Sequence, residues 1–127
     1  MIRTLDTSAW IEWFAASETG LRLQRFVPDQ RDCVVPTIVQ LELNKWLMRK
    51  ADESRADDVM AHTMHCRIVE LDTDIALYAA ELSIRHKLAT ADAIIYATAL
   101  LHDAELLTCD AHFDGLDFVR FVPKRSG

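Results

Sequence analysis

Residues 90–110 read TADAIIYATALLHDAELLTCD, and this stretch predicts a buried helix followed by a short strand. The segment 91–101 is apolar or alanine on almost every side, and Thr90 is suited to cap its N-terminus, which is typical of a helix covered all round. The run 105–108 is short and apolar and ends before Cys109 and Asp110, as a buried strand does. A helix that leads into such a strand is the repeating unit of a parallel α/β sheet.

The same alternation of short apolar runs and helical stretches recurs through the rest of the chain. A first helix is predicted from Thr7 or Ser8 to Thr19-Gly20, and Thr37 is the expected cap of a later one. The other predicted elements are strands at 2–5, 33–35 and 68–71 and helices at 21–26, 37–47, 51–65 and 72–82. Strands separated by helices pair in parallel with right-handed crossovers. We therefore expect an α/β fold, a three-layer α/β/α sandwich with a central, mainly parallel sheet.

The composition is that of an ordinary folded domain. The 127 residues are half apolar and include only three glycines and three prolines, which favours a single domain over residues 1–127. No apolar run approaches the ~18 residues of a membrane span, and Asp6 falls where a signal peptide is hydrophobic. We expect a cytoplasmic protein without a membrane segment. Cys33, Cys66 and Cys109 lack metal-knuckle spacing and are predicted to be reduced thiols in the core.

The net charge is acidic. Fourteen Lys and Arg against twenty Asp and Glu give −6, which argues against a broad basic surface for nucleic acid. If five of the acids bind two divalent ions, four positive charges return locally and little acidity remains. The candidates for phosphate contacts, or alternatively for solvated helix faces, are Arg22, Arg25, Arg49, Lys50, Arg55, Lys124 and Arg125.

Four acids are predicted to meet at one edge of the sheet. Ligands of such folds bind outside the carboxyl ends of the strands. Asp6 follows the first predicted strand and Asp110 the last, so both lie at that edge. Glu42 lies one to two turns into its helix and Asp92 in the first turn of the buried helix, which brings both within reach of the same place.

Carboxylates gathered in this way predict a site for hard cations. They raise one another's pKa unless cations neutralise them, and oxygen ligands select Mg²⁺ or Mn²⁺ over zinc. Two such ions ~4 Å apart are the usual arrangement for cleaving phosphodiesters in line. Asp114 is a candidate for a second ion or its water, and the Ser8 and Thr108 hydroxyls are expected to hydrogen-bond the carboxylates.

Each of these acids also has a purely structural interpretation. Asp6 alone is typical of a helix cap, Glu42 of a partner for Lys45, and Asp92 of a partner for the helix dipole. Yet an acid within an otherwise apolar helix needs a partner, because a buried carboxylate is costly. His112 is interpreted as a solvated loop residue.

Two further side-chain groups are assigned structural roles. The helical spacing of Trp10, Trp13 and Phe14 favours core or dimer contacts over base stacking. His62, His65 and Cys66 have no fourth ligand nearby, which argues against zinc.

Four local motifs together resemble a known family. The segments LDTS at 5–8, LEL at 41–43, ADAIIYA at 91–97 and LTCDAHF at 107–113 resemble the PIN-domain ribonucleases, and among these the VapC-type toxins of toxin–antitoxin pairs. The resemblance implies a metal-dependent endoribonuclease acting on structured RNA such as tRNA or rRNA, with Asp6, Glu42, Asp92 and Asp110 as its metal-binding acids. It also implies a homodimer that is inhibited by a cognate antitoxin whose tail fills a groove near the active site.

Functions of other classes fit less well. A receiver-like signalling domain needs paired acids after the first strand and a lysine near the last, and no lysine lies between Lys87 and Lys124. A phosphatase of the haloacid dehalogenase type needs a second aspartate where Ser8 stands. The remaining alternative is a non-catalytic PIN-like module that binds RNA or a partner.

Overall fold

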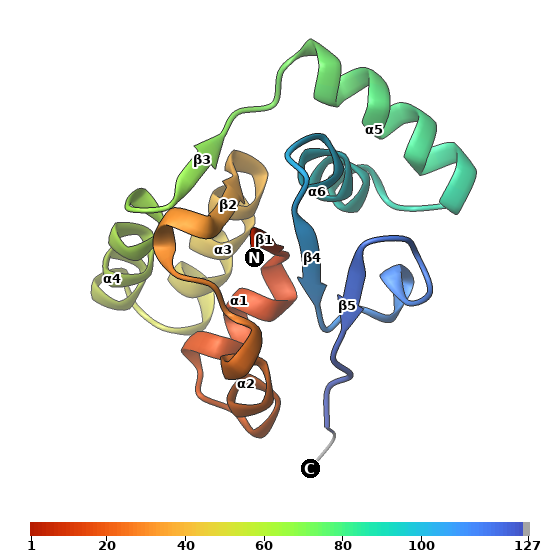
Figure 1. Ribbon diagram of the computed structural model, residues 1–127. Coiled ribbons are helices and arrows are strands. Elements are labelled where there is room, and N and C mark those ends of the chain that lie inside the picture. The colour runs from red at the N-terminus through yellow and green to blue at the C-terminus, as the bar shows by residue number, and fades with distance from the viewer. Residues whose placement is uncertain (126–127) are drawn as a thin grey trace.

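The structure, a computed structural model, describes residues 1–125 and is built on a five-stranded sheet (Figure 1). The strands are β1 (Arg3–Leu5), β2 (Cys33–Pro36), β3 (Arg67–Val69), β4 (Glu105–Thr108) and β5 (Val119–Phe121). Their order is β3-β2-β1-β4-β5, and all neighbouring pairs are parallel. The predicted parallel sheet of an α/β/α fold is confirmed, with β1 and β4 adjacent at its centre.

Within residues 1–125, six α-helices flank this sheet. They are α1 (Thr7–Phe14), α2 (Glu18–Leu23), α3 (Thr37–Lys50), α4 (Glu53–Met64), α5 (Thr73–His86) and α6 (Thr90–Leu101). Short 3-10 helices are η1 (Gln24–Phe26), η2 (Gln30–Asp32) and η3 (Ala111–Phe113). Helix α6 contacts β2 and β4 and packs against α5, which lies at the outside of the molecule (Figure 1). No helix within residues 1–125 is long and apolar enough to cross a membrane.

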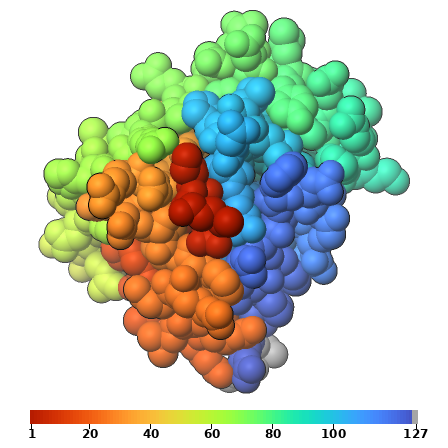
Figure 2. Space-filling view, in the orientation of Figure 1, coloured from red at the N-terminus to blue at the C-terminus, as the bar shows by residue number. Residues whose placement is uncertain are grey.

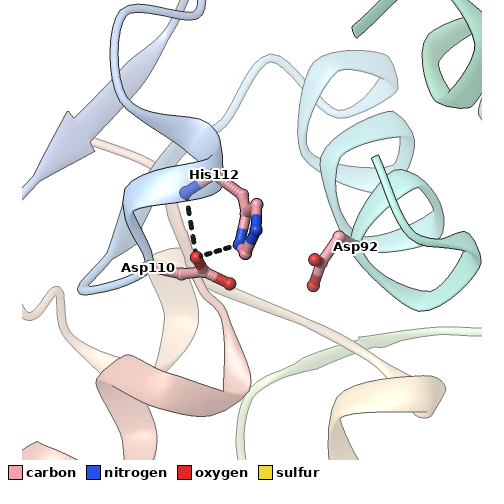
Figure 3. A group of neighbouring side chains, drawn as sticks. All are labelled: Asp92, Asp110 and His112. Carbon is pink, nitrogen blue, oxygen red and sulfur yellow. Dashed lines mark hydrogen bonds and ion pairs between the residues drawn. The ribbon is translucent and has the colours of Figure 1, made fainter. Parts of the chain in front are cut away.

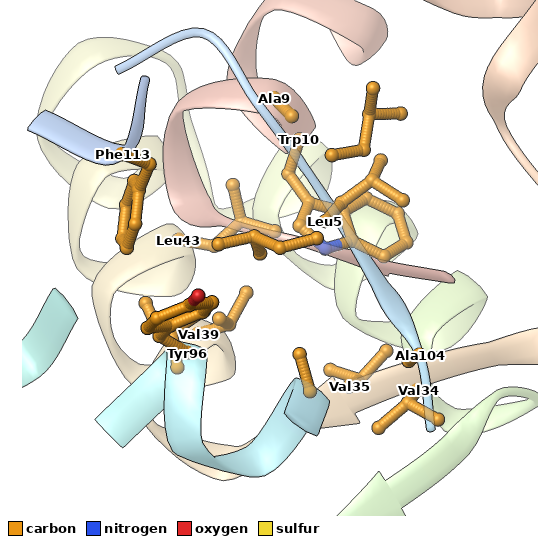
Figure 4. Packing of buried hydrophobic residues seen from close by; sticks show 14 of the residues in the cluster. Leu5, Ala9, Trp10, Val34, Val35, Val39, Leu43, Tyr96, Ala104 and Phe113 are labelled. Atoms are coloured by element: carbon orange, nitrogen blue, oxygen red, sulfur yellow. The ribbon is translucent and has the colours of Figure 1, made fainter. Parts of the chain in front are cut away.

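The core joins the helices to the sheet. Trp10 and Leu43 lie beside Leu5 of β1, with Tyr96 of α6 and Phe113 of η3 close by (Figure 4), and all five are at most 2% exposed. Half of the residues of α6 are buried, in its central and C-terminal part, and its two end residues, Thr90 and Leu101, are exposed. All three cysteines are free thiols, with Cys33 and Cys109 buried and Cys66 half-buried.

The helix starts differ from those predicted. Asp6, not Thr7 or Ser8, is the N-cap of α1, because its carboxylate accepts the Ala9 N–H. Pro36 and Ala89 occupy the N-cap positions of α3 and α6 without capping hydrogen bonds, so the predicted caps Thr37 and Thr90 are simply the first helical residues.

Two other features of the secondary structure differ from the prediction. Helix α1 ends at Phe14 rather than near Gly20, because Ala16 adopts a positive φ of 51° that starts a new helix direction. Strand β5 was not predicted, since it has only three residues at the sheet edge and its middle residue, Arg120, is charged and exposed.

Tyr96 ties α6 to the segment before β5. Its hydroxyl donates to the Asp117 carbonyl oxygen over 2.7 Å. Tyr96→Phe is expected to lower the free energy of unfolding by about 1 kcal/mol, the net value of one such bond, as measured by urea unfolding. The control is Tyr78→Phe, which should change the free energy of unfolding less. The Tyr78 hydroxyl has no hydrogen-bond partner among the described residues. Equal losses from both variants would contradict this role.

Candidate metal centre at the carboxyl ends of β1 and β4

Asp6 is held rigidly where β1 ends. Its Oδ1 accepts hydrogen bonds from the Ser8 hydroxyl at 2.7 Å and the Ala9 N–H at 2.9 Å, and its Oδ2 accepts from the Thr108 hydroxyl at 2.6 Å. The side chain is 3% exposed. Burial, together with the charge of nearby Asp110, raises the pKa of Asp6 to about 6, although these hydrogen bonds act in the opposite direction. The carboxylate therefore lies in a site that does not fully compensate its charge.

Asp110 follows β4 and is linked to Asp6 through one hydroxyl. The Thr108 Oγ1 that donates to Asp6 also accepts the Asp110 backbone N–H at 2.9 Å. The Oδ1 of Asp110 accepts the His112 backbone N–H at 2.9 Å and lies 2.7 Å from the His112 Nδ1. Because β1 and β4 are hydrogen-bonded neighbours, Thr108 fixes the two acids relative to each other.

Asp92 approaches Asp110 from α6. One ligand atom each of Asp92, Asp110 and His112 lie within 4.8 Å of one another (Figure 3). Burial raises the pKa of Asp92, and the charges of Asp110 and Glu42 raise it further, while His112 lowers it. The repulsion among these acids is what a bound cation would relieve.

Glu42 lies on α3 beside this group rather than within it. Its Oε1 accepts the Thr7 hydroxyl at 2.7 Å, a contact that the sequence interpretation of Thr7 as a cap missed. Within residues 1–125, Glu42 forms no ion pair with Lys45, its predicted partner. Both residues line an open pocket of about 420 Å³ together with Arg49, so cationic side chains stand near the acids.

The structure does not bring Asp114 to the group. Asp114 follows η3 and is exposed, and its carboxylate forms no hydrogen bond with any residue that the structure describes. His112, in contrast, was interpreted as a solvated loop residue. Its side chain is 76% exposed, yet it contacts Asp110, and its position two residues after an acid was the only sequence signal of this contact.

The zinc alternative gains no support from residues 1–125. Among these, Asp92, Asp110 and His112 form the only group of three or more His, Cys, Asp or Glu side chains close enough to share an ion. His62 instead packs edge-on against the rings of Trp10, Trp13 and Phe14. Two carboxylates and an imidazole, with two more acids beside them, are a donor set that fits a divalent cation preferring oxygen ligands.

Comparisons with known proteins agree on one family. The sequence profile of the PIN domain matches residues 3–119. A chain in a toxin–antitoxin complex from Klebsiella pneumoniae matches with a TM-score of 0.82 and 27% sequence identity, over 97% of this chain and 99% of that one. No curated protein matches.

Two further structures share the fold. VapC20 of Mycobacterium tuberculosis, described as a sarcin-ricin loop cleaving toxin, has a TM-score of 0.67 and 22% identity, and 91% of each chain is covered. A chain of VapBC-1 from nontypeable Haemophilus influenzae has a TM-score of 0.70 and 20% identity, over 97% of this chain and 98% of that one.

Proposed function

The chain belongs to the PIN domain family, and from this membership we propose that it is a metal-dependent endoribonuclease toxin neutralised by an antitoxin. The observation that carries the proposal is the approach of Asp92 to Asp110 at the carboxyl edge of the sheet, where Thr108 also links Asp6 to Asp110. Parallel α/β folds bind ligands at this edge. The similar toxin from Mycobacterium tuberculosis and the toxin–antitoxin complex from Klebsiella pneumoniae support the same function.

The proposed cofactor is Mg²⁺ or Mn²⁺, as two ions held by Asp6, Glu42, Asp92 and Asp110. Such ions, when bound, supply an activated water and neutralise charge on the phosphate that is attacked. His112 holds the Oδ1 of Asp110, and the other oxygen of Asp110 lies on the side of Asp92 (Figure 3). Asp114, exposed directly after η3, stays a candidate for binding a second ion or its water.

The chain's own residues would position these acids rather than transfer protons. Thr108 connects Asp6 to the backbone of Asp110. The Ser8 hydroxyl donates a hydrogen bond to Asp6, and its oxygen accepts one from the Cys109 N–H at 3.1 Å. These hydroxyls fix the carboxylates before substrate arrives, so little reorganisation is needed when charge develops on the phosphate. We propose no protein general base.

The proposed partners are an RNA substrate, an antitoxin and a second copy of the chain. Two of the similar structures are toxin–antitoxin assemblies from Klebsiella pneumoniae and Haemophilus influenzae. Structured RNA such as tRNA or rRNA is the proposed substrate class.

Cleavage of total cellular RNA by the purified, antitoxin-free chain tests this function. Discrete fragments are expected with Mg²⁺ or Mn²⁺ and none with EDTA, because without a bound cation the carboxylates repel the negatively charged phosphodiester. Restoring the divalent cation after EDTA should restore the fragments, which separates metal loss from unfolding. Intact RNA in every lane, from protein shown to be folded, would favour the alternative of a non-catalytic module that binds RNA or a partner.

A further inference from the structure

Four arginines gather on one face of the molecule, three of them around one phenylalanine ring. The guanidinium carbons of Arg3, Arg25 and Arg120 lie 5.6, 5.0 and 4.6 Å from the centre of the Phe26 ring. Arg22, Arg25 and Arg120 line an open pocket of about 340 Å³ beside Phe26. Figure 2 shows the N-terminus, the orange segment that holds α2 and η1, and the blue C-terminal segment meeting on this face.

The charges of this arginine pocket are only partly balanced. Glu105 accepts from Arg3 at 2.7 Å and from Arg120 at 3.3 Å. Arg22 donates only to the Pro123 carbonyl oxygen, at 3.4 Å, and Arg25 forms no ion pair in the part of the chain that the structure describes. Within the described residues, only two of these four guanidinium groups pair with a carboxylate, in a chain whose net charge is −6.

Such a concentration of positive charge fits an anionic ligand. Attraction to the face of the Phe26 ring offsets part of the repulsion among the guanidinium groups of Arg3, Arg25 and Arg120. Planar guanidinium groups bind phosphate oxygens through paired hydrogen bonds. The pocket therefore has the chemistry of a phosphate site rather than of a solvated helix face.

The arginine pocket adjoins the acidic group through the sheet. Phe121, on the pocket wall, pairs with Thr108 in the β4–β5 register, and the Val122 N–H donates to the Thr108 carbonyl oxygen at 2.9 Å. Thr108 is also the residue that hydrogen-bonds Asp6.

We propose that the arginine pocket binds the phosphate backbone of the RNA strand that continues from the bond to be cut at the acidic group. This inference rests on the proposed function, because it takes RNA as the substrate. The acids repel a phosphate chain until cations bind, so a neighbouring basic pocket would supply the attraction that holds the strand. An acidic segment of a partner protein is the competing ligand.

Binding of RNA by charge-matched variants tests the arginine pocket. The test variant is Arg22→Gln/Arg25→Gln, and its control is Arg31→Gln/Arg85→Gln, which removes the same charge from two exposed arginines of η2 and α5. Each is combined with Asp92→Asn so that RNA is bound without being cut. The probe is a fluorescein-labelled single-stranded RNA of mixed sequence, followed by anisotropy over a range of salt concentrations.

The test variant is expected to raise the Kd for this RNA about tenfold, with the control within about twofold of its parent. The slope of log Kd against log salt should fall by about 1.4, which is two phosphate contacts at ~0.7 each for a single strand. Arg22→Lys/Arg25→Lys keeps the charge and loses the planar fork, so its Kd should lie between those of parent and test variant. In a chain with Asp92 intact, KM should rise while kcat stays within about twofold.

Two results would overturn the proposal that the arginine pocket binds RNA. One is RNA binding by the test variant that equals that of its control, provided circular dichroism shows both folded. The other is a loss of antitoxin binding with RNA binding unchanged, which would assign the pocket to an acidic protein segment. If the parent chain cuts no RNA and the test variant still loses RNA affinity, the proposed catalysis fails while the pocket stands.

Discussion

Replacing Asp92 with asparagine is expected to reduce RNA cleavage by about 10³-fold while the protein stays folded. The variant removes the only acidic group that α6 brings to Asp110. Loss of this carboxylate weakens the hold on a divalent cation and the neutralisation of the phosphate. Folding should survive, because burial and the charges of Asp110 and Glu42 already disfavour the ionised form of Asp92. Initial rates of RNA cleavage with saturating Mg²⁺ measure the effect.

Asp74→Asn is the matched control for this experiment. Asp74 occupies the first turn of α5 as Asp92 occupies that of α6, but it is exposed and lies outside the acidic group. Both variants lose a favourable interaction with a helix dipole, of about 0.3–1 kcal/mol. The difference between their cleavage rates therefore measures the contribution of Asp92 to the acidic group. If Asp92→Asn cleaves RNA at the same rate as Asp74→Asn, Asp92 only stabilises helix α6 and has no part in cleavage.

Much of the fold follows from periodicity alone. Strand β4 and helix α6 lie within one residue of the predicted bounds, because both are continuously apolar and bounded by polar residues. Strand β5 escaped prediction because a three-residue edge strand needs only one neighbour and no apolar run. The sequence left the cap of α1 open, because Asp6, Thr7 and Ser8 are all good caps, and in the structure Asp6 accepts the Ala9 N–H.

The candidate site was less accessible to sequence reasoning than the fold. Chain order places acids after β1 and β4, so their neighbourhood could be predicted from parallel topology. The contacts that orient them could not, since Thr108 and Asp6 are 102 residues apart and meet only through strand pairing. His112 lies on the short 3-10 helix η3 and Asp114 directly after it, and no periodicity encodes the direction of such a turn. The contact of His112 with Asp110 could therefore not be predicted from the sequence.

The buried charge of Asp6 predicts an unusual dependence of stability on pH in EDTA. The pKa of Asp6 is raised from 3.8 to about 6 in the folded chain, so between these values the folded state binds more protons than the unfolded state. Stability from this group is therefore full below pH 3.8 and is lost as pH rises toward 6 and above. The loss amounts to about 3 kcal/mol, from ~1.4 kcal/mol for each unit of pKa.

Asp6→Asn should remove this loss of stability at higher pH and should also abolish RNA cleavage. Urea unfolding in EDTA at pH 4.5 and 7.5 measures the change, taken as parent minus variant so that the other acids cancel. Asp72→Asn makes the same substitution at the exposed N-cap of α5 and should retain the parent's pH dependence. With Mg²⁺ present the difference should shrink, because a cation offsets the buried charge. The contradicting result is a variant that is less stable than the parent at pH 7.5 in EDTA. It would mean that the hydrogen bonds from Ser8, Ala9 and Thr108 stabilise the charged carboxylate by more than its desolvation costs. Asp6 would then be a structural cap of α1 rather than a destabilising acid kept to bind a cation.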